Sequence, residues 1–337
     1  MRRVLSAAIV LVAALEASAK IVALDTVVIP VADLDRSVAF YTGVLEFTKV
    51  GTSEVAGEDV EQSLGLFGVR ARIARLKLGD ESLELTQFLA PEGRAYPDDA
   101  RSNDRSFQHV AIIVSDMAKA YAKLREHNVR HASSGPQKLP DWNPNAGGIE
   151  AFYFKDPDGH PLEILHFPEG KGAARWHRRD RLFLGVDHTA IVIGATEASA
   201  AFYGMALGMT KAGESENYGT EQEHLNNVFG ARLRITAMRT PMGPGVEFLE
   251  YLAPAGGRPA PVDRKANDLA AVTTVFVGDD AEGYAAALRK AGYDWVSPGS
   301  VDIHDRGFGY TKSATIEDPD GHFIRLVQKG EGKRAAR

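Results

Sequence analysis

The sequence predicts an α+β fold composed of two tandem copies of one unit, with two smaller modules in each copy. Two observations carry this prediction: short landmarks recur at a fixed distance, and each quarter of the chain repeats one order of strand and helix patterns. The landmarks recur 162 or 163 residues later in the chain: Phe40-Tyr41 as Phe202-Tyr203, Leu89–Pro91 as Leu252–Pro254, and Asp156–Gly159 as Asp318–Gly321.

Each of the four modules begins with a β-branched strand, continues with an amphipathic helix and ends with an apolar strand. We number the modules one to four along the chain. Their opening strands are expected at Ile21–Val31, Phe107–Val114, Val186–Ile193 and Val272–Val277. The helices are expected at Leu34–Val44, Met117–His127, Glu197–Ala206 and Ala281–Ala291. The closing strands are expected at Ser82–Phe88, Pro161–Phe167, Val246–Leu252 and Phe323–Gln328.

Connecting segments divide the chain between these modules. Pro168–Arg181 is rich in Gly and Arg and has no apolar period, so it is interpreted as a solvated linker. The expected boundaries are a first domain at 20–168 with modules one and two, a linker at 169–183, and a second domain at 184–330 with modules three and four. The Asp156–Gly159 turn and its copy are expected to serve only as tight turns.

The first nineteen residues have the pattern of a secretory signal peptide. A basic Met1–Arg3 segment precedes the apolar run Val4–Leu15, and the small residues Ala17–Ala19 follow. The apolar run of twelve residues is shorter than the roughly 17 to 25 that span a bilayer. We therefore expect cleavage near Ala19, a periplasmic or secreted product and no permanent membrane span.

Composition excludes several classes of function. The chain has 39 Lys and Arg against 45 Asp and Glu, so nothing in its overall charge favours binding to nucleic acid. It has no cysteine, which excludes disulfides, thiolate metal ligands and a cysteine nucleophile. Any metal ion must therefore be held by histidine, carboxylate or water.

Two segments resemble a known family. Val186–Met209 (VDHTAIVIGATEASAAFYGMALGM) and Phe154–Phe167 (FKDPDGHPLEILHF) are similar to the opening and closing segments of glyoxalase I and the vicinal oxygen chelate superfamily. That superfamily also includes extradiol dioxygenases, fosfomycin resistance enzymes and bleomycin-binding proteins. The resemblance covers nearly all of residues 21 to 328, and it implies paired βαβββ modules that form half-barrels. It is less specific for the reaction, because one scaffold supports many chemistries.

The resemblance also implies where metal ligands lie. Metal-bearing members place a His or Gln in the opening strand and a Glu in the closing strand of a module. The corresponding residues of modules one to four are Thr26 and Glu84, His109 and Glu163, His188 and Glu247, and Val272 and Arg325. Only modules two and three keep both ligands, so His109, Glu163, His188 and Glu247 are the candidate ligands of one divalent ion such as Ni, Zn, Fe or Mn.

The strand pattern around the two glutamates supports this interpretation. Glu163 and Glu247 lie in strands that are apolar on both faces and are therefore expected to be buried. A buried carboxylate needs a partner, and a divalent cation shared with two histidines is a natural one. The alternatives are an arginine or backbone donors for each glutamate and an ordinary hydrogen-bonded role for each histidine.

Module pairing decides whether the four ligands meet. Pairing of one with two and three with four leaves Glu84, His109 and Glu163 in one cup and His188 and Glu247 in the other. Pairing of two with three and one with four unites all four candidates. It also places Glu84 opposite Arg325, although the first arrangement likewise brings an acidic residue, Glu247, near Arg325. Completeness of the ligand set favours the second arrangement.

The function implied is a metal-dependent lyase or isomerase of glyoxalase I type that acts on a small substrate with vicinal oxygens. Glu163 or Glu247 would be the catalytic base. A glutathione adduct fits poorly with an exported protein. Two alternatives remain: an extradiol-type Fe(II) dioxygenase with two His and one carboxylate, and a metal-free protein that binds a small molecule. The loops Pro140–Gly148 and Gly213–Asn227 are candidates for the border of the cup.

Overall fold

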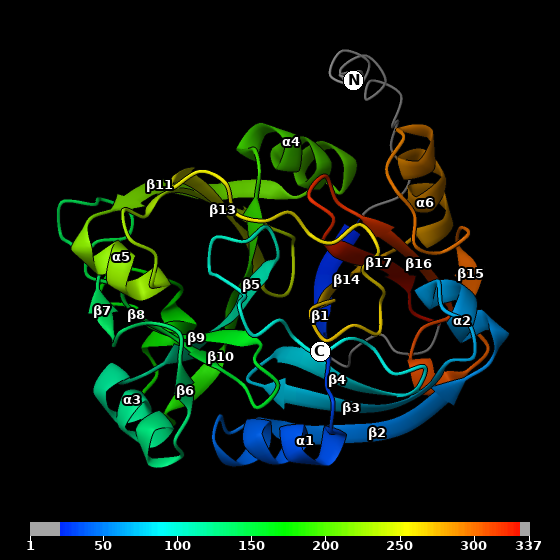
Figure 1. The fold of residues 1–337 in the computed structure, drawn as a ribbon, viewed down its shortest axis with the longest axis horizontal. Helices are drawn as coiled ribbons and strands as arrows, with labels where there is room; N and C mark the ends of the chain where they lie inside the picture. The colour runs from blue at the N-terminus through cyan, green and yellow to red at the C-terminus, as the bar shows by residue number, and fades with distance from the viewer. Residues whose placement is uncertain (1–20, 331–337) are drawn as a thin grey trace.

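The computed structural model describes residues 21–330, so the expected signal peptide at residues 1–19 lies outside the described residues. Two strongly curved sheets stand side by side (Figure 1). One sheet comes from the middle of the chain, and the other combines its beginning and its end. This is the α+β architecture of four βαβββ modules that the repeats and the family resemblance predict.

The first sheet, which we call sheet A, joins modules one and four in the order β15-β16-β17-β14-β1-β4-β3-β2. Module one provides β1 (Ile21–Pro30), β2 (Thr48–Ala56), β3 (Arg70–Leu78) and β4 (Glu81–Ala90). Module four provides β14 (Thr273–Gly278), β15 (Val301–Asp302), β16 (Lys312–Glu317) and β17 (Phe323–Gln328). The two modules meet where β1 pairs antiparallel with β14.

Sheet B joins modules two and three in the order β11-β12-β13-β10-β5-β9-β8-β6, with β7 paired to β8. Module two provides β5 (Phe107–Val114), β6 (Arg130–His131), β7 (Gln137–Lys138), β8 (Glu150–Lys155) and β9 (Pro161–His166). Module three provides β10 (Phe183–Ile193), β11 (Thr210–Tyr218), β12 (Arg232–Arg239) and β13 (Gly245–Ala253). The structure therefore has the pairing that unites modules two and three, through the antiparallel pair β10 and β5.

Helices α1 (Leu34–Gly43), α3 (Met117–Glu126) and α6 (Ala281–Lys290) pack their apolar residues into the main hydrophobic core. Each is preceded by a capping aspartate, Asp33, Asp116 or Asp280, whose side chain accepts a hydrogen bond from a backbone N–H of the first turn. The helix expected at Glu197–Ala206 is instead a short α4 (Thr196–Ala200) followed by a π-helical turn, η3 (Ala201–Ala206).

Two further helices are absent from the sequence prediction. They are α2 (Glu58–Leu64) and α5 (Thr220–Asn226), which occupy equivalent places in modules one and three. The expected loop Gly213–Asn227 is therefore wrong, because it contains most of β11 and all of α5. Both helices are only seven residues long, too short for a clear apolar period. Helix α5 of module three contacts β7 and β8 of module two, so it spans the two modules that share sheet B.

The Asp156–Gly159 turn does more than reverse the chain. The Asp156 carboxylate accepts hydrogen bonds from the backbone of the turn and contacts the imidazole of buried His160 at 2.9 Å. It also accepts a 3.3 Å hydrogen bond from the Tyr41 hydroxyl of helix α1. The expectation of a purely local turn is thus wrong, because the aspartate links module two to module one.

The stretch between β9 and β10 is anchored rather than fully solvated. It contains a 3-10 turn, η2 (Ala174–His177), in which Trp176 is buried. Its neighbour Arg175 contacts Glu81 at the start of β4, with 2.5 Å between the guanidinium nitrogen and the carboxylate oxygen. A second 3-10 turn, η4 (Arg306–Phe308), lies in module four. The interpretation of Pro168–Arg181 as a solvated connector is therefore wrong at its centre.

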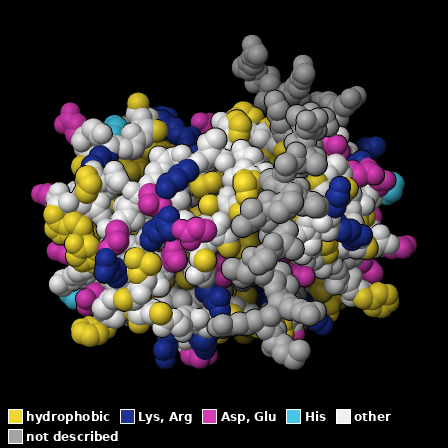
Figure 2. All heavy atoms as spheres, turned by 90° about the horizontal axis from the view of Figure 1, so that it is seen from above, with side chains coloured by type: hydrophobic (Ala, Val, Ile, Leu, Met, Phe, Trp, Pro, Cys, Tyr) yellow, Lys and Arg dark blue, Asp and Glu magenta, His cyan; other side chains and the backbone are white. Residues whose placement is uncertain are grey.

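No helix within residues 21–330 is long and apolar enough to cross a membrane. On the face of the molecule shown in Figure 2, basic and acidic side chains are interspersed over the described part of the surface.

Candidate metal centre

The four candidate ligands lie on neighbouring strands of sheet B in a nearly symmetric arrangement. In the parallel pair β5 and β9, Glu163 is opposite Ala111, two residues after His109. In the parallel pair β10 and β13, Glu247 is opposite Ala190, two residues after His188. Because residues two apart on a strand share a face, this register places all four side chains on one face of the sheet.

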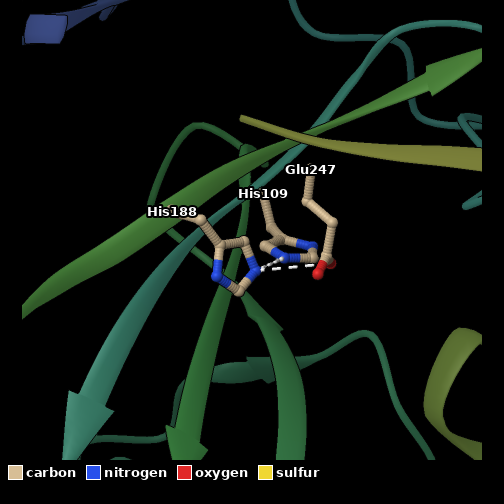
Figure 3. A group of neighbouring side chains, drawn as sticks. All are labelled: His109, His188 and Glu247. Carbon is tan, nitrogen blue, oxygen red and sulfur yellow. Dashed lines mark hydrogen bonds and ion pairs between the residues drawn. The ribbon is translucent and has the colours of Figure 1, made fainter. Parts of the chain in front are cut away.

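The side chains converge. The Nε2 atoms of His109 and His188 are 3.3 Å apart, and Glu163 Oε2 lies 3.1 Å from the first and 3.7 Å from the second. Glu247 Oε2 lies 3.4 Å from His188 Nε2. Figure 3 shows His109, His188 and Glu247 directed toward one point, and their ligand atoms all lie within 4.8 Å of one another.

A contact at the Nδ1 atom of each imidazole orients the ring so that its Nε2 atom faces this point. His109 Nδ1 contacts Gln108 Oε1, and His188 Nδ1 lies 3.0 Å from Asp187 Oδ2. Both partners are acceptors, so each Nδ1 carries a proton and each ring turns its Nε2 atom toward the other. Glu163 Oε2 is buried and has no hydrogen-bond partner within residues 21–330.

The carboxylate oxygens and imidazole nitrogens that face one another in this buried place need a cation. Two nitrogens bound to one ion at about 2.1 Å lie roughly 3.0 to 3.4 Å apart, which matches the spacing of the two Nε2 atoms. Two imidazoles and two carboxylates are also an ordinary ligand set for a divalent transition metal. The residues present therefore fit a divalent ion.

The aspartate next to His188 is part of the centre, and sequence reasoning missed it. Asp187 contacts Arg239 at 2.7 Å through its side chain and accepts a 2.9 Å hydrogen bond from Trp176 Nε1. Burial alone would raise the pKa of Asp187, but the hydrogen bonds and charges of His188 and Arg239 hold it well below its usual range. Asp187 is therefore an ionised carboxylate that orients His188.

The electrostatics show how strongly the centre demands positive charge. Burial disfavours the charged form of His188, yet the carboxylates of Glu247 and Asp187 raise its pKa to about 10. Burial would raise the pKa of Glu247, but the charge of His188 lowers it. Without a metal ion, a proton on His188 thus supplies the cation.

A chain of uncharged polar side chains begins next to this centre. Tyr153 stacks at 4.9 Å from the His109 ring, and its surroundings include Glu163 and Tyr251. Beyond Tyr251 are Gln222 and Asn226, which contact each other on helix α5. Three buried atoms of this group have no hydrogen-bond partner within the described chain: Tyr251 Oη, Gln222 Oε1 and Asn226 Nδ2.

The loop Pro140–Gly148 reaches the far edge of the same sheet. Asn143 donates a 2.7 Å hydrogen bond to Asn217 of β11, and the rings of Trp142 and Tyr218 are 4.5 Å apart. The loop thereby joins module two to the edge strand of module three.

The equivalent positions of sheet A hold no comparable ligand set. Thr26 and Glu84 occupy the places of His188 and Glu247, as expected. The register of β14 and β17 puts Arg325 opposite Val275, so the residue in the place of His109 is Thr273. The assignment to Val272 is wrong by one residue, because matched spacing along the chain does not account for the different loop lengths. Glu84 makes its ion pair with Arg75, at 3.4 Å. Burial raises the pKa of Glu84, and the charges of Arg75 and Arg325 offset only part of this rise.

Comparison with known proteins identifies the class. A family model described as the Glyoxalase/Bleomycin resistance protein/Dioxygenase superfamily matches residues 23–164 and 185–326. The chain therefore belongs to this superfamily and contains two of its domains in tandem, as the sequence resemblance indicated.

Individual relatives differ in their reactions. A 2-epi-5-epi-valiolone epimerase from Actinomyces sp is 33% identical over 153 residues, which are 44% of this chain and 81% of the relative. A lactoylglutathione lyase from Salmonella typhimurium is 30% identical over 147 residues, 43% of this chain and 90% of the relative. Glyoxalase I from Zea mays shares the fold, with a TM-score of 0.59, 18% identity and 92% of each chain covered.

Proposed function

We propose that this protein is a divalent-metal-dependent isomerase or lyase of the glyoxalase type, acting on a small substrate that carries two vicinal oxygens. The observation that carries the proposal is the convergence of the ligand atoms of His109, His188 and Glu247 within 4.8 Å of one another, with buried Glu163 Oε2 3.1 Å from His109 Nε2. Family membership supports the same conclusion, since the named relatives include an epimerase and a lyase.

The four residues would hold the ion, whose identity is open among Ni, Zn, Fe and Mn. A dication held there supplies Lewis acidity, which stabilises the negative charge that develops on substrate oxygens when a neighbouring C–H is deprotonated. The two negative charges of the glutamates neutralise the double positive charge of the ion.

The two glutamates differ in access. The Glu163 side chain is 4% exposed, whereas that of Glu247 is 22% exposed. A base must reach the substrate carbon, so we assign proton removal and return to Glu247. Glu163 is the buried ligand that fixes the ion against His109.

The uncharged lining of the cup indicates the kind of substrate. Tyr251, Gln222 and Asn226 offer unsatisfied hydrogen-bonding groups and no charge, which suits a neutral compound with several hydroxyl groups. The epimerase among the relatives supports this direction. We therefore favour proton transfer next to the carbonyl of a hydroxylated ketone.

A second candidate is the extradiol-type dioxygenase, because His109, His188 and Glu247 alone form a two-histidine, one-carboxylate set. The proximity of Glu163 Oε2 to both imidazoles favours the four-ligand site and hence the isomerase.

We also propose that the protein is exported, with cleavage near Ala19, because the basic, apolar and small-residue segments occur in the order of a signal peptide. Intact-mass measurement of the exported fraction tests this. A chain that retains Met1 and stays in the cytosol contradicts it.

The function is tested with metal-loaded protein and a panel of α-hydroxy ketones, α-oxo aldehydes and catechols in D₂O. The proposal predicts deuterium incorporation at the carbon next to the carbonyl, dependent on metal and without oxygen consumption. Oxygen uptake with a catechol would establish the dioxygenase instead. Binding without any turnover across the panel would favour a metal-free or non-catalytic binding protein.

A further inference from the structure

The cup of sheet A, which we call the second cup, lacks the histidines of the candidate metal centre but retains a cavity. Its volume is about 770 Å³, and both Thr26 and Glu84, the counterparts of His188 and Glu247, line it. The positions equivalent to His188 and Glu247 thus border an open cavity in sheet A.

A buried cation stands close to this cavity. Arg325 takes the position of Glu163, is 4% exposed and has an Nε atom without a hydrogen-bond partner within residues 21–330. Its guanidinium lies 5.0 Å from the Phe308 ring centroid and within electrostatic range of Glu84 and Tyr310. A carboxylate of the metal centre has therefore been replaced by a fixed positive charge.

A second guanidinium is held in place at the wall of the cavity. Arg75 donates hydrogen bonds of 2.8 and 2.9 Å to the carbonyl oxygens of Gly307 and Phe308. Its Nε lies 3.4 Å from the Glu84 carboxylate, and the ion pair with Glu84 does not use all the N–H donors of Arg75. An arginine fixed by the backbone in this way loses little side-chain freedom when it binds an anion.

The remaining charged residues of the lining leave a positive excess. Arg306 and Lys329 add two cations, and Asp25 accepts hydrogen bonds from Lys329 and Tyr310. Three cations therefore line the cavity against the carboxylates of Asp25 and Glu84, with Arg325 behind them.

The uncharged part of the lining combines hydroxyl groups with apolar surface. Thr26, Ser82 and Thr311 provide the hydroxyls, and Val50, which is 58% exposed, and Leu83 provide the apolar surface. An exposed valine beside fixed arginines suits a molecule with a single charge and an apolar body. Inorganic phosphate is compact and carries two charges, so it would make no favourable contact with the apolar surface of Val50 and Leu83.

From these observations we propose that the second cup is a metal-independent binding site for a small organic carboxylate. The guanidinium groups replace the metal ion of sheet B as the source of positive charge. They bind the carboxylate, and no reaction follows. This site does not depend on the proposed activity of sheet B.

The test is calorimetric titration of the full chain with acetate, benzoate and the neutral isostere benzamide, with and without metal. We expect at least one carboxylate to bind with a Kd below about 10 mM, benzamide to bind much more weakly, and metal removal to change neither. Replacing both exposed cations, Arg306→Ala with Lys329→Ala, should weaken carboxylate binding about tenfold. The exposed linker variant Arg178→Ala is the matched control and should bind as the wild type does.

Four results would overturn the proposal. The first is the absence of binding by every carboxylate tested, and the second is equal affinity for benzoate and benzamide. The third is binding that His109→Ala removes and the Arg306 and Lys329 variant leaves intact, which would place the ligand in sheet B. Tighter binding of inorganic phosphate than of any carboxylate would reject the organic carboxylate as the ligand. An Arg325→Met variant with an unchanged melting temperature tests the buried cation separately and should also bind less tightly.

Discussion

His109 and His188 are separated by 79 positions in the chain, yet their Nε2 atoms lie 3.3 Å apart. Strand β10 returns antiparallel along β5 to bring them together, and each imidazole is oriented by the residue that precedes it. The contact exists only because modules two and three share sheet B. The candidate centre is thus a product of the connection between the two halves of the chain.

The orientation of His188 by Asp187 leads to the first prediction. Asp187→Asn removes the carboxylate that holds the Nδ1 proton, and it should lower metal affinity by about 10- to 100-fold. Trp176→Phe removes one donor to Asp187 and should have a smaller effect in the same direction. Metal titration of both variants measures this. Asp180→Asn, an exposed linker aspartate, is the control, and an unchanged affinity in Asp187→Asn would contradict the role of Asp187.

The different access of the two glutamates leads to the second prediction. Glu247→Gln should lower kcat by about 10² to 10⁴ while much of the metal remains bound, because a proton carrier is lost. Glu163→Gln should act mainly through loss of metal. Deuterium exchange into substrate and metal content are measured on the same samples. The reverse pattern would assign the base to Glu163.

The uncharged lining of the sheet B cup leads to the third prediction. Asn226→Leu removes a buried amide whose Nδ2 atom has no hydrogen-bond partner within residues 21–330, and it should reduce kcat/KM for a hydroxylated ketone by an amount equivalent to about 1 to 3 kcal/mol. Steady-state kinetics with this ketone and with an analogue lacking the distal hydroxyl groups measures the effect. The analogue should be affected less, and Gln62→Leu, an exposed side chain on helix α2 of module one, should affect neither. An equal loss with both substrates would mean that Asn226 is only structural.

The buried pair Asp156 and His160 leads to the fourth prediction, on stability. Burial disfavours charged His160, but the charge and hydrogen bond of Asp156 raise its pKa. The unfolded chain releases this proton near a pKa of about 6.5, so the stabilisation is complete below that pH and is lost as the pH rises through the higher folded pKa. Across that interval the free energy of unfolding should fall by up to about 1.4 kcal/mol per pH unit.

The pH dependence that Asp156 gives to the free energy of unfolding has the opposite sign to that of His160. Burial would raise the pKa of Asp156, yet His160 and the turn amides lower it, so its contribution is present above a pH of about 3.9 and lost as the pH falls through the folded pKa. Urea unfolding of wild type and His160→Gln between pH 3 and pH 10 tests both limbs. An unchanged decline above neutral pH in the variant would show that other groups cause it.

Much of the fold could be predicted from the sequence because the signals repeat. The recurrence of Phe40-Tyr41 and Asp156–Gly159 predicts the two halves, and the apolar strands predict the sheets. The strand expected at Phe107–Val114 has these bounds in the structure. Helices α2 and α5 were missed because a single turn or two of helix leaves no period to detect.

The sequence predicts four candidate ligands but not the residues that orient them. Gln108 and Asp187 each precede a histidine, and side chains next to each other on a regular strand point to opposite faces. In the structure each of the two residues sits at a shift in the register between β5 and β10. Such a β-bulge re-aims a side chain, and an isolated sequence gives no sign of it.

The second cup shows a further limit of prediction from the sequence. Sequence spacing assigned Val272 to the place that Thr273 occupies, and a slip of one residue moves a side chain to the other face of a strand. The sequence also does not predict the contact between Glu84 and Arg75, because both residues lie in module one and Arg75 is not at a ligand position.

The central claim is that one ion is bound jointly by both halves of the chain, and metal content of three variants tests it most directly. His109→Ala and His188→Ala should each lower metal occupancy to a similar extent, and Glu84→Gln should retain the wild-type content because it belongs to the second cup. Measurement by mass spectrometry on samples dialysed together, each checked for folding, gives the answer. Metal loss in Glu84→Gln with full retention in His188→Ala would contradict the account.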